Sequence, residues 1–346
     1  MSSRWWPWSL VQSSCVNKSS RVPSSPWRLS ALVYGLPTVN KPPQGANCHC
    51  AMKSNKGLFW LAAIVTVLIW GTAYTLIAVI VPYLSPAWLV AVRTSLAAII
   101  LISYAHWRGH RLPPLTSKLW LWYALMGFIG MTLPFFLTAS GQKQIDSGLT
   151  SILAGTMPLI TLVLAHFFIP GERMSGRKTL GFVIGFLGII MLFLPWPPSL
   201  RLVAHWQAQL LILGTSFCYA ILTIIAKRAP HLPASLGAAM MIGSAAVFSL
   251  IWALVEGAPK TLPPAKALWA LLALAIGATG LAQILYLRLI QLKGPGFVAR
   301  LVYLVPVVSV IAGIVFLEEP FSWRIVAAML IIFAGLAIAR PTRLPT

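Results

Sequence analysis

Acidic residues are almost missing from this chain, which has five Asp and Glu against 26 Lys and Arg in 346 residues. Charged residues of both signs make up 9% of the chain, compared with about 25% in an average soluble domain. The acidic residues lie in loops or at the ends of apolar runs, whereas a proton-driven pump is expected to carry one in the membrane interior. Exchange or downhill efflux therefore fits better than proton coupling, although Asp146 or Glu256 could titrate from the mouth of a cavity.

The sequence motifs of several other protein classes are missing as well. No GxxxxGK[ST] sequence occurs, so the chain itself cannot hold the phosphates of ATP. The six His form neither a metal-ligand spacing nor a catalytic triad, and the four Cys suggest no disulfide framework. The formal net charge of +21 is scattered through the loops, so we expect no nucleic-acid partner. We also expect no cofactor and no metal.

Hydrophobic residues, in contrast, make up 58% of the chain and gather in runs of about 20 residues. In lipid every backbone N–H and C=O needs an internal partner, so these runs are expected to be helices. The expected fold is an all-α polytopic membrane protein with ten transmembrane helices. We place them near residues 58–81, 86–105, 119–138, 148–169, 178–195, 208–226, 235–255, 267–287, 296–317 and 323–339.

The second half of the chain repeats the first. Gly148 aligns with Gly296 and Pro158 with Pro306, ten residues further on in each case. The repeats are expected at residues 56–195 and 207–340, with five apolar runs in each. Because five is an odd number of crossings, the second copy is inverted relative to the first, an arrangement typical of secondary transporters.

Residues 1–51 do not fit the repeat. This leader is rich in Ser, contains Arg and has no Asp or Glu, so it resembles a transit peptide. The alternative, which we favour, is that translation starts at Met52. Either way we expect the leader to be disordered, and we regard Cys48, His49 and Cys50 as incidental.

The basic residues predict the orientation in the membrane. Most Lys and Arg near the helix ends fall on one side, which the positive-inside rule assigns to the cytoplasm. Both ends of the ten-helix unit are then cytoplasmic, in the cell membrane. The opposite side has only Lys143, Arg201, Lys260, Lys266 and Arg324.

Short motifs add a family resemblance. Trp70-Gly71-Thr72, Pro86 followed by Arg93, Gly171-Glu172-Arg173 and the run GFVIGFLG resemble the EamA family of the drug/metabolite transporter superfamily. The resemblance covers residues 56–340. It implies ten helices in two inverted five-helix repeats, a central cavity, and export or exchange of small metabolites. The second copy departs from the pattern, since Arg93 aligns with Met240 and Tyr74 with Phe217.

Arg93 is the first candidate for substrate binding, because a charged residue deep in the bilayer usually turns inward to a partner. It lies about 10 Å from the end of its helix at 1.5 Å per residue, and Tyr74 is expected at the same depth. Trp70 shares a helical face with Tyr74. These residues could bind a carboxylate, although Arg93 could equally tie helices together or extend to the headgroups.

Other candidates are less specific. Gln283, Arg300 and Tyr303 form a second, shallower level, where they could also be ordinary interfacial residues. Phe135 and Phe136 could line a cavity or simply pack. Pro158 and Pro306 are candidate helix breaks, and matched breaks in two halves indicate a midplane site or a packing kink.

Three functions stay open. The favoured one is a secondary transporter of amino-acid-like or other amphipathic, carboxylate-bearing metabolites, working by alternating access. The others are a membrane enzyme acting on lipid or isoprenoid substrates and a non-transporting partner subunit. The expected partners are a small-molecule substrate and the lipid bilayer. Gly181, Gly185 and Gly188 in the fifth span indicate internal packing first and a homodimer contact second.

Overall fold

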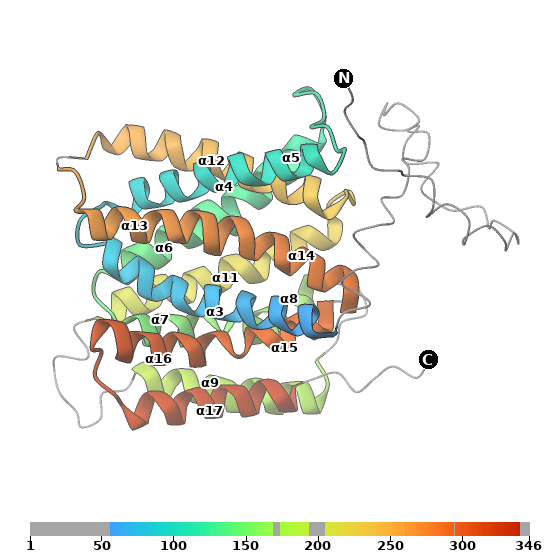
Figure 1. Ribbon diagram of the computed structural model, residues 1–346. Coiled ribbons are helices and arrows are strands. Elements are labelled where there is room, and N and C mark those ends of the chain that lie inside the picture. Colours follow the sequence, from blue (N-terminus) through green and yellow to red (C-terminus); the bar gives the residue numbers. More distant parts are fainter. Residues whose placement is uncertain (1–55, 169–173, 194–204, 260, 294, 340–346) are drawn as a thin grey trace, which may run out of the picture. The chain divides into compact units, whose positions relative to one another are not determined.

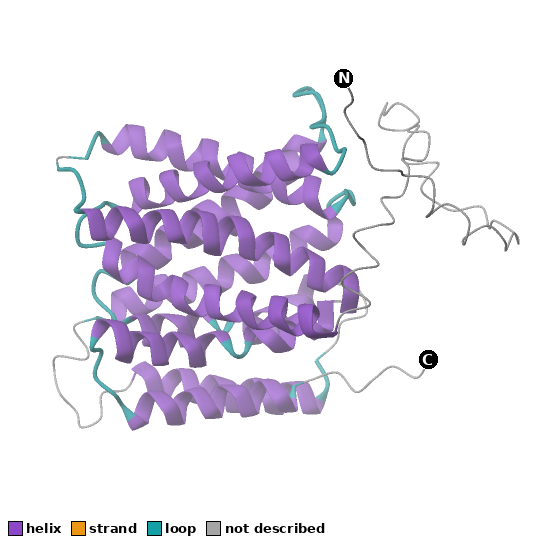
Figure 2. Cartoon of the chain, viewed as in Figure 1, coloured by secondary structure: helices purple, strands orange, loops and turns teal. Residues whose placement is uncertain are grey.

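The described part of this computed structural model consists of helices and their connecting loops (Figure 2). It covers residues 56–168, 174–193, 205–259, 261–293 and 295–339, and no strand occurs within these ranges. The leader, residues 1–51, and the candidate motif residue Glu172 lie outside the described residues. The all-helical expectation is confirmed.

Seven helical stretches are long and apolar enough to cross a membrane: Gly57–Ile80, Pro86–Trp107, Leu119–Gly141, Ser147–Phe168, Trp206–Arg228, Ala234–Glu256 and Ala265–Ile290. Val305–Leu317 and Trp323–Ile338 are apolar but shorter. The chain is therefore a polytopic membrane protein. Ten crossings and the inverted repeat remain predictions.

The helices of the first half are α3 (Lys56–Ile80), α4 (Pro86–Trp107), α5 (Leu119–Gly127), the π-helix η2 (Phe128–Thr132), α6 (Leu133–Gly141), α7 (Ser147–Ala154), α8 (Met157–Phe168) and α9 (Gly176–Phe193). Those of the second half are α11 (Trp206–Arg228), α12 (Ala234–Glu256), α13 (Ala265–Ala273), the π-helix η3 (Leu274–Leu281), α14 (Ala282–Lys293), α15 (Pro295–Val302), α16 (Val305–Leu317) and α17 (Trp323–Ile338). In each half a π-helix precedes an interrupted helix along the chain. In the first half η2 precedes α7 and α8, and in the second half η3 precedes α15 and α16.

Helices of the first half pack on helices of the second (Figure 1). The most extensive contact joins α4 to α12, where Ala97, Leu101 and Ala105 meet Ala239 and Ile242. Alanines allow two membrane helices to approach closely. Further contacts join α3 to α16, α6 to α11 and α9 to α17. The protein interior is thus built largely between the halves.

The glycines of the fifth span pack inside the chain. A Cβ added to Gly181 would lie 2.5 Å from the backbone oxygen of Gly335, and one added to Gly188 would lie 3.0 Å from that of Ala328. These positions hold α9 close to α17, so the expected internal packing is confirmed. A homodimer would have to use other surfaces.

The loops gather at two ends of the helix array (Figure 1). We call the end with residues 81–85 the Leu84 end and the end with residues 108–118 the His110 end. All described acidic residues lie at the Leu84 end: Asp146, Glu256, Glu318 and Glu319. The His110 end has only basic charges among its described residues, as a membrane protein with a positive-inside bias would show.

Candidate functional site

Arg93 lies buried in the middle of the protein, on α4. Its side chain is 7% exposed, and its Nε donates a hydrogen bond of 2.6 Å to Oγ1 of Thr279 in η3. Its guanidinium carbon lies 3.7 Å from the ring centroid of Phe135 in α6. Arg93 therefore joins a helix of the first half to the π-helix of the second, against an aromatic face.

The charge of Arg93 has no acidic partner among the described residues. The described Asp and Glu residues lie at or beyond helix ends, far along the chain from the middle of α4. The hydrogen bond to Thr279 uses Nε, which leaves Nη1 and Nη2 without a hydrogen-bond partner in the described structure. An unneutralised cation in the membrane interior is costly, about 2.5–3.5 kcal/mol on insertion scales. Arg93 is therefore available to an anionic ligand.

The π-helix η3 shapes the surroundings of Arg93. Thr279 donates to the backbone oxygen of Leu274, five residues earlier, at 3.3 Å, and the preceding carbonyl, of Ala278, accepts a 3.1 Å hydrogen bond from Nε1 of Trp70. Two neighbouring residues of η3 thus hold Arg93 and Trp70. π-Helical turns often occur at functional sites. The sequence did not reveal this segment, because one wider turn leaves the apolar pattern unchanged.

Two tyrosines share the region around Arg93. Tyr74 of α3 and Tyr219 of α11 both interact electrostatically with Arg93 and with each other. Both are half-buried, Tyr74 in the C-terminal part of α3 and Tyr219 near the middle of α11. Sequence reasoning missed Tyr219, because the repeat alignment pointed to Phe217, which is 47% exposed. Only the direction of each side chain on α11 separates the two residues.

Trp70 leads from Arg93 toward the second predicted level. Its ring lies 5.3 Å from that of Tyr286 in α14, centroid to centroid, at 51°. Gln283, one turn before Tyr286, is half-buried and has no hydrogen-bond partner among the described residues. Gln283 therefore lies on α14, the helix that follows η3, and its side-chain amide makes no hydrogen bond to the described residues.

No described contact joins Phe136 or Tyr303 directly to Arg93. Phe136 stacks on Trp252 of α12, with centroids 4.3 Å apart at 27°, and packs in the same apolar cluster as its neighbour Phe135. Tyr303 lies 5.9 Å from the ring of Phe333 in α17, and it packs against the same apolar cluster as Tyr74. The side chain of Arg300 lies outside the described residues.

The two candidate prolines follow matched interruptions. Pro158 is the second residue of α8 and Pro306 the second of α16, and each helix follows a two-residue turn. A Cβ added to Gly155, in the first turn, would lie 3.3 Å from Cγ of Pro306, so the two interruptions touch. Pro158 has no N–H for the carbonyl of Ala154. Oγ of Ser216 in α11 occupies that carbonyl at 3.1 Å.

A carboxylate joins the halves at the Leu84 end. Glu318 ends α16 in the left-handed conformation, with a φ of 55°, and the next residue, Glu319, turns back to α7. The carboxylate of Glu319 accepts hydrogen bonds from the backbone N–H of Ser147 at 2.7 Å and of Gly148 at 3.2 Å. A carboxylate at a helix N-terminus is stabilised by the unpaired N–H groups there. Sequence reasoning did not predict this cap.

A model of the EamA-like transporter family matches residues 56–194 and again residues 206–340. The chain belongs to this family. The two matches of one family model agree with the sequence repeat, and they include every residue that surrounds Arg93.

Relatives of this EamA-like protein are also described as transporters. The "uncharacterized inner membrane transporter YedA" of Escherichia coli strain K12 is 29% identical over 71% of this chain and 78% of its own length. An "uncharacterized transporter" of Archaeoglobus fulgidus is 24% identical over 81% of this chain and 97% of its own length. The family and these relatives point to a membrane transporter rather than an enzyme.

A solved structure described as "Crystal structure of protein" shares the fold. Its TM-score is 0.58 at 21% identity, covering 82% of this chain and 98% of that chain. At this identity the likeness concerns the fold alone.

Proposed function

We propose that this EamA-like protein is a secondary transporter that exports or exchanges small organic metabolites bearing a carboxylate across the cytoplasmic membrane. The observation that carries the proposal is Arg93, a buried cation with two unpaired Nη groups and no acidic partner among the described residues. Two parallel N–H donors match the two oxygens of a carboxylate. A bound carboxylate would neutralise the charge that the protein leaves open.

The neighbours of Arg93 favour a ligand that also has an apolar or aromatic part. Phe135 covers one face of the guanidinium, and Tyr74 and Tyr219 lie beside it. Aromatic side chains offer apolar faces together with hydroxyl groups that orient a ligand. An amino-acid-like or other amphipathic carboxylate fits this combination. Trp70 of α3 and Gln283 of α14 would extend the binding region toward Tyr286.

We propose that transport proceeds by alternating access of two inverted five-helix repeats, with both ends of the ten-helix unit in the cytoplasm. The touching interruptions at Gly155 and Pro306 support this mechanism, because discontinuous helices at the interface of repeats are typical of transporter binding sites. The basic His110 end supports the orientation. The described acidic residues lie at or beyond the ends of the spanning helices, so exchange or downhill efflux is proposed in place of proton coupling.

The test is counterflow in proteoliposomes that contain the purified full chain. Vesicles loaded with one unlabelled carboxylate at a time, such as an aromatic or aliphatic amino acid, should take up the same labelled compound. Arg93→Ala should abolish this uptake, and Arg93→Lys should retain only a small part, since an ammonium cannot form the two-pronged contact. Arg108→Ala changes an exposed arginine just beyond the same helix and should transport normally.

Two results would contradict the proposal. Uptake by well-folded Arg93→Ala protein would remove Arg93 from the substrate site. No uptake of any compound class above empty vesicles would argue against a carrier altogether.

A further inference from the structure

A tight turn ends α4 at the His110 end. The backbone N–H groups of Arg108, Gly109 and His110 donate to the carbonyls of Tyr104, His106 and Ala105 at 3.0, 2.8 and 3.0 Å. Gly109 has a φ of 80°, which favours glycine and reverses the chain. The turn therefore brings residues 110–112 back beside the last turn of α4.

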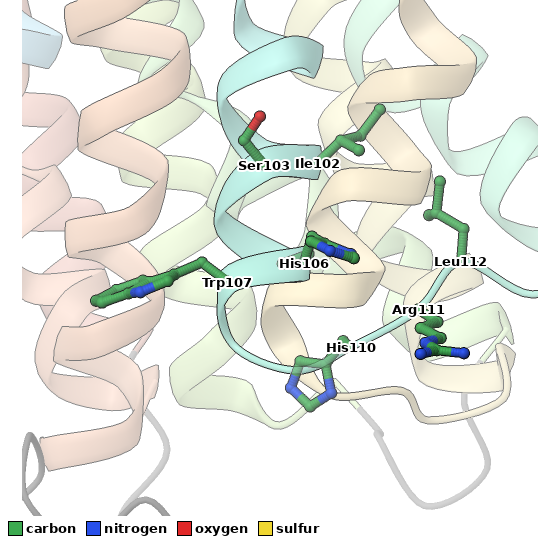
Figure 3. A pocket seen from close by; sticks show the side chains of 8 residues that line it. Ile102, Ser103, His106, Trp107, His110, Arg111 and Leu112 are labelled. Atoms are coloured by element: carbon green, nitrogen blue, oxygen red, sulfur yellow. The ribbon is translucent and has the colours of Figure 1, made fainter.

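The returning chain and the last turns of α4 line an open cavity of about 520 Å³ (Figure 3). His106 on α4 and His110 and Arg111 in the loop supply nitrogen groups to its wall. No acidic residue lines the cavity, and all described acidic residues lie at the opposite end of the protein. The chemistry of this wall suits an anion.

The rest of the wall is apolar. Ile102, Trp107 and Leu112 line the same cavity, and Trp107, the last residue of α4, is 75% exposed. Tryptophan is enriched where a membrane meets water, because its ring is apolar and its N–H is polar. A ligand that fills this cavity would therefore have a charged part and a hydrocarbon part.

Helix capping alone does not explain the basic groups. Positive side chains are favourable near the C-terminus of a helix, where carbonyls are unpaired. Here the turn already occupies three of those carbonyls with backbone N–H groups. Burial, and then the positive charge of Arg108, lower the pKa of His110, so the positive charge of the cavity wall comes from Arg111.

We propose that this cavity binds the phosphate headgroup of an anionic phospholipid from the leaflet at the His110 end. Arg111 would hold two phosphate oxygens, since the guanidinium fork matches phosphate geometry. His106 and His110 would donate to the remaining oxygens, while Ile102 and Trp107 would cover the start of the acyl chains. Basic pockets at the cytoplasmic side of membrane helices bind lipid headgroups in this way, and the cytoplasmic leaflet carries the anionic lipid.

The test measures lipid binding to the detergent-purified full chain by native mass spectrometry. Phosphatidylglycerol is the probe, and phosphatidylcholine of the same chain length is the comparison. Wild type should retain phosphatidylglycerol at least five-fold better than phosphatidylcholine, and the double variant His110→Ala, Arg111→Ala should lose most of this preference. The matched control is His231→Ala, Lys118→Ala, two exposed basic residues at the same end that do not line the cavity. This control should bind like wild type.

Several outcomes would overturn the proposal. Equal lipid preference in the pocket variant and wild type would place the lipid elsewhere. Inorganic phosphate that competes for the cavity without any preference for phosphatidylglycerol would identify a soluble anion as the ligand. Arg93→Ala should keep the lipid preference, so failure of the substrate site and failure of this site are distinguishable.

Discussion

The two halves of the protein use the same architecture for different purposes. In the first half, Thr132 of η2 donates to the backbone oxygen of Ala245 in α12 at 3.1 Å. In the second half, Thr279 of η3 accepts from Nε of Arg93 in α4 at 2.6 Å. Thr132 follows Arg93 by the same interval as Thr279 follows Met240. Each π-helix thus presents a threonine to the opposite half, but only one threonine meets a charge.

The comparison shows that the two repeats differ at the position of Arg93, so that only one of them supplies a charge. Met240, the counterpart of Arg93, is fully buried in an apolar cluster with Leu119 and Tyr123 of α5. The first half supplies the cation, and the second half supplies its partners Thr279 and Tyr219. Neither half contains the site by itself.

The largest expected effect on transport comes from giving the first half the residue that the second half has at the matching position. Arg93→Met copies the second half, and we expect substrate uptake in proteoliposomes to fall to background. Thermal unfolding in detergent should stay at the wild-type temperature or rise, because a buried unpaired cation costs about 2.5–3.5 kcal/mol in the membrane interior. A strongly destabilised Arg93→Met protein would show that Arg93 is chiefly structural.

The two π-helical threonines offer a matched pair of smaller changes. Thr279→Val removes the acceptor for Nε of Arg93, and a lost partner for a buried charged group costs about 1–3 kcal/mol. We expect substrate affinity to fall roughly 5- to 100-fold at that cost. Thr132→Val removes the equivalent contact to α12 and should lower the unfolding temperature while substrate affinity is kept. Equal losses of affinity in both variants would contradict a site whose charge comes from the first half.

The two helix interruptions differ in one hydroxyl. Ser216 of α11 donates to the carbonyls of Leu153 and Ala154 at 2.9 and 3.1 Å, whereas its counterpart in α3 is Ala73. Ser216→Ala leaves the carbonyl of Ala154 without that donor, whereas the carbonyl of Leu153 keeps the donors of Thr156, so we expect a loss of about 1 kcal/mol in the free energy of unfolding. Unfolding by heat in detergent measures it, and Thr223→Ala, a more exposed hydroxyl on the same helix, is the control.

The smallest expected effect concerns Asp146 at the Leu84 end, where all the described acidic residues lie. Burial, and then the negative charge of Glu319, raise the pKa of Asp146, while His205 opposes this rise. The folded state therefore binds this proton more tightly than the unfolded state does, and its contribution to stability falls as the pH rises from the ordinary aspartate pKa through the raised one. Asp146→Asn removes this dependence.

The measurement for Asp146 is the unfolding temperature as a function of pH. As the pH rises from the ordinary aspartate pKa through the raised pKa of Asp146, the unfolding temperature of the variant should rise relative to that of wild type. At higher pH the difference between the two should stay constant. A constant difference at every pH would show that Asp146 does not titrate there.

Sequence reasoning predicted the seven long apolar helices, because the length of a hydrophobic run is the main signal of a membrane helix, while the other three of the ten predicted crossings stay predictions. Arg93 could be identified from the sequence because a charged residue is rare inside an apolar run. Tyr219 and the π-helix η3 could not be identified from the sequence, because neither a tyrosine nor a wider helical turn interrupts the apolar pattern of its span. That Phe135 contacts Arg93 whereas Phe136 stacks on Trp252 depends on side-chain direction, which neighbouring positions in a sequence do not show.

The contact between Gly155 and Pro306 ties the flexibility of the two halves together. Each turn lacks part of the regular hydrogen-bonded ladder, so both chains bend most easily at this level. Because the two interruptions touch, a bend at one of them displaces the other. In the alternating-access mechanism proposed above, opening toward one side of the bilayer and closing toward the other would then be a single coupled movement.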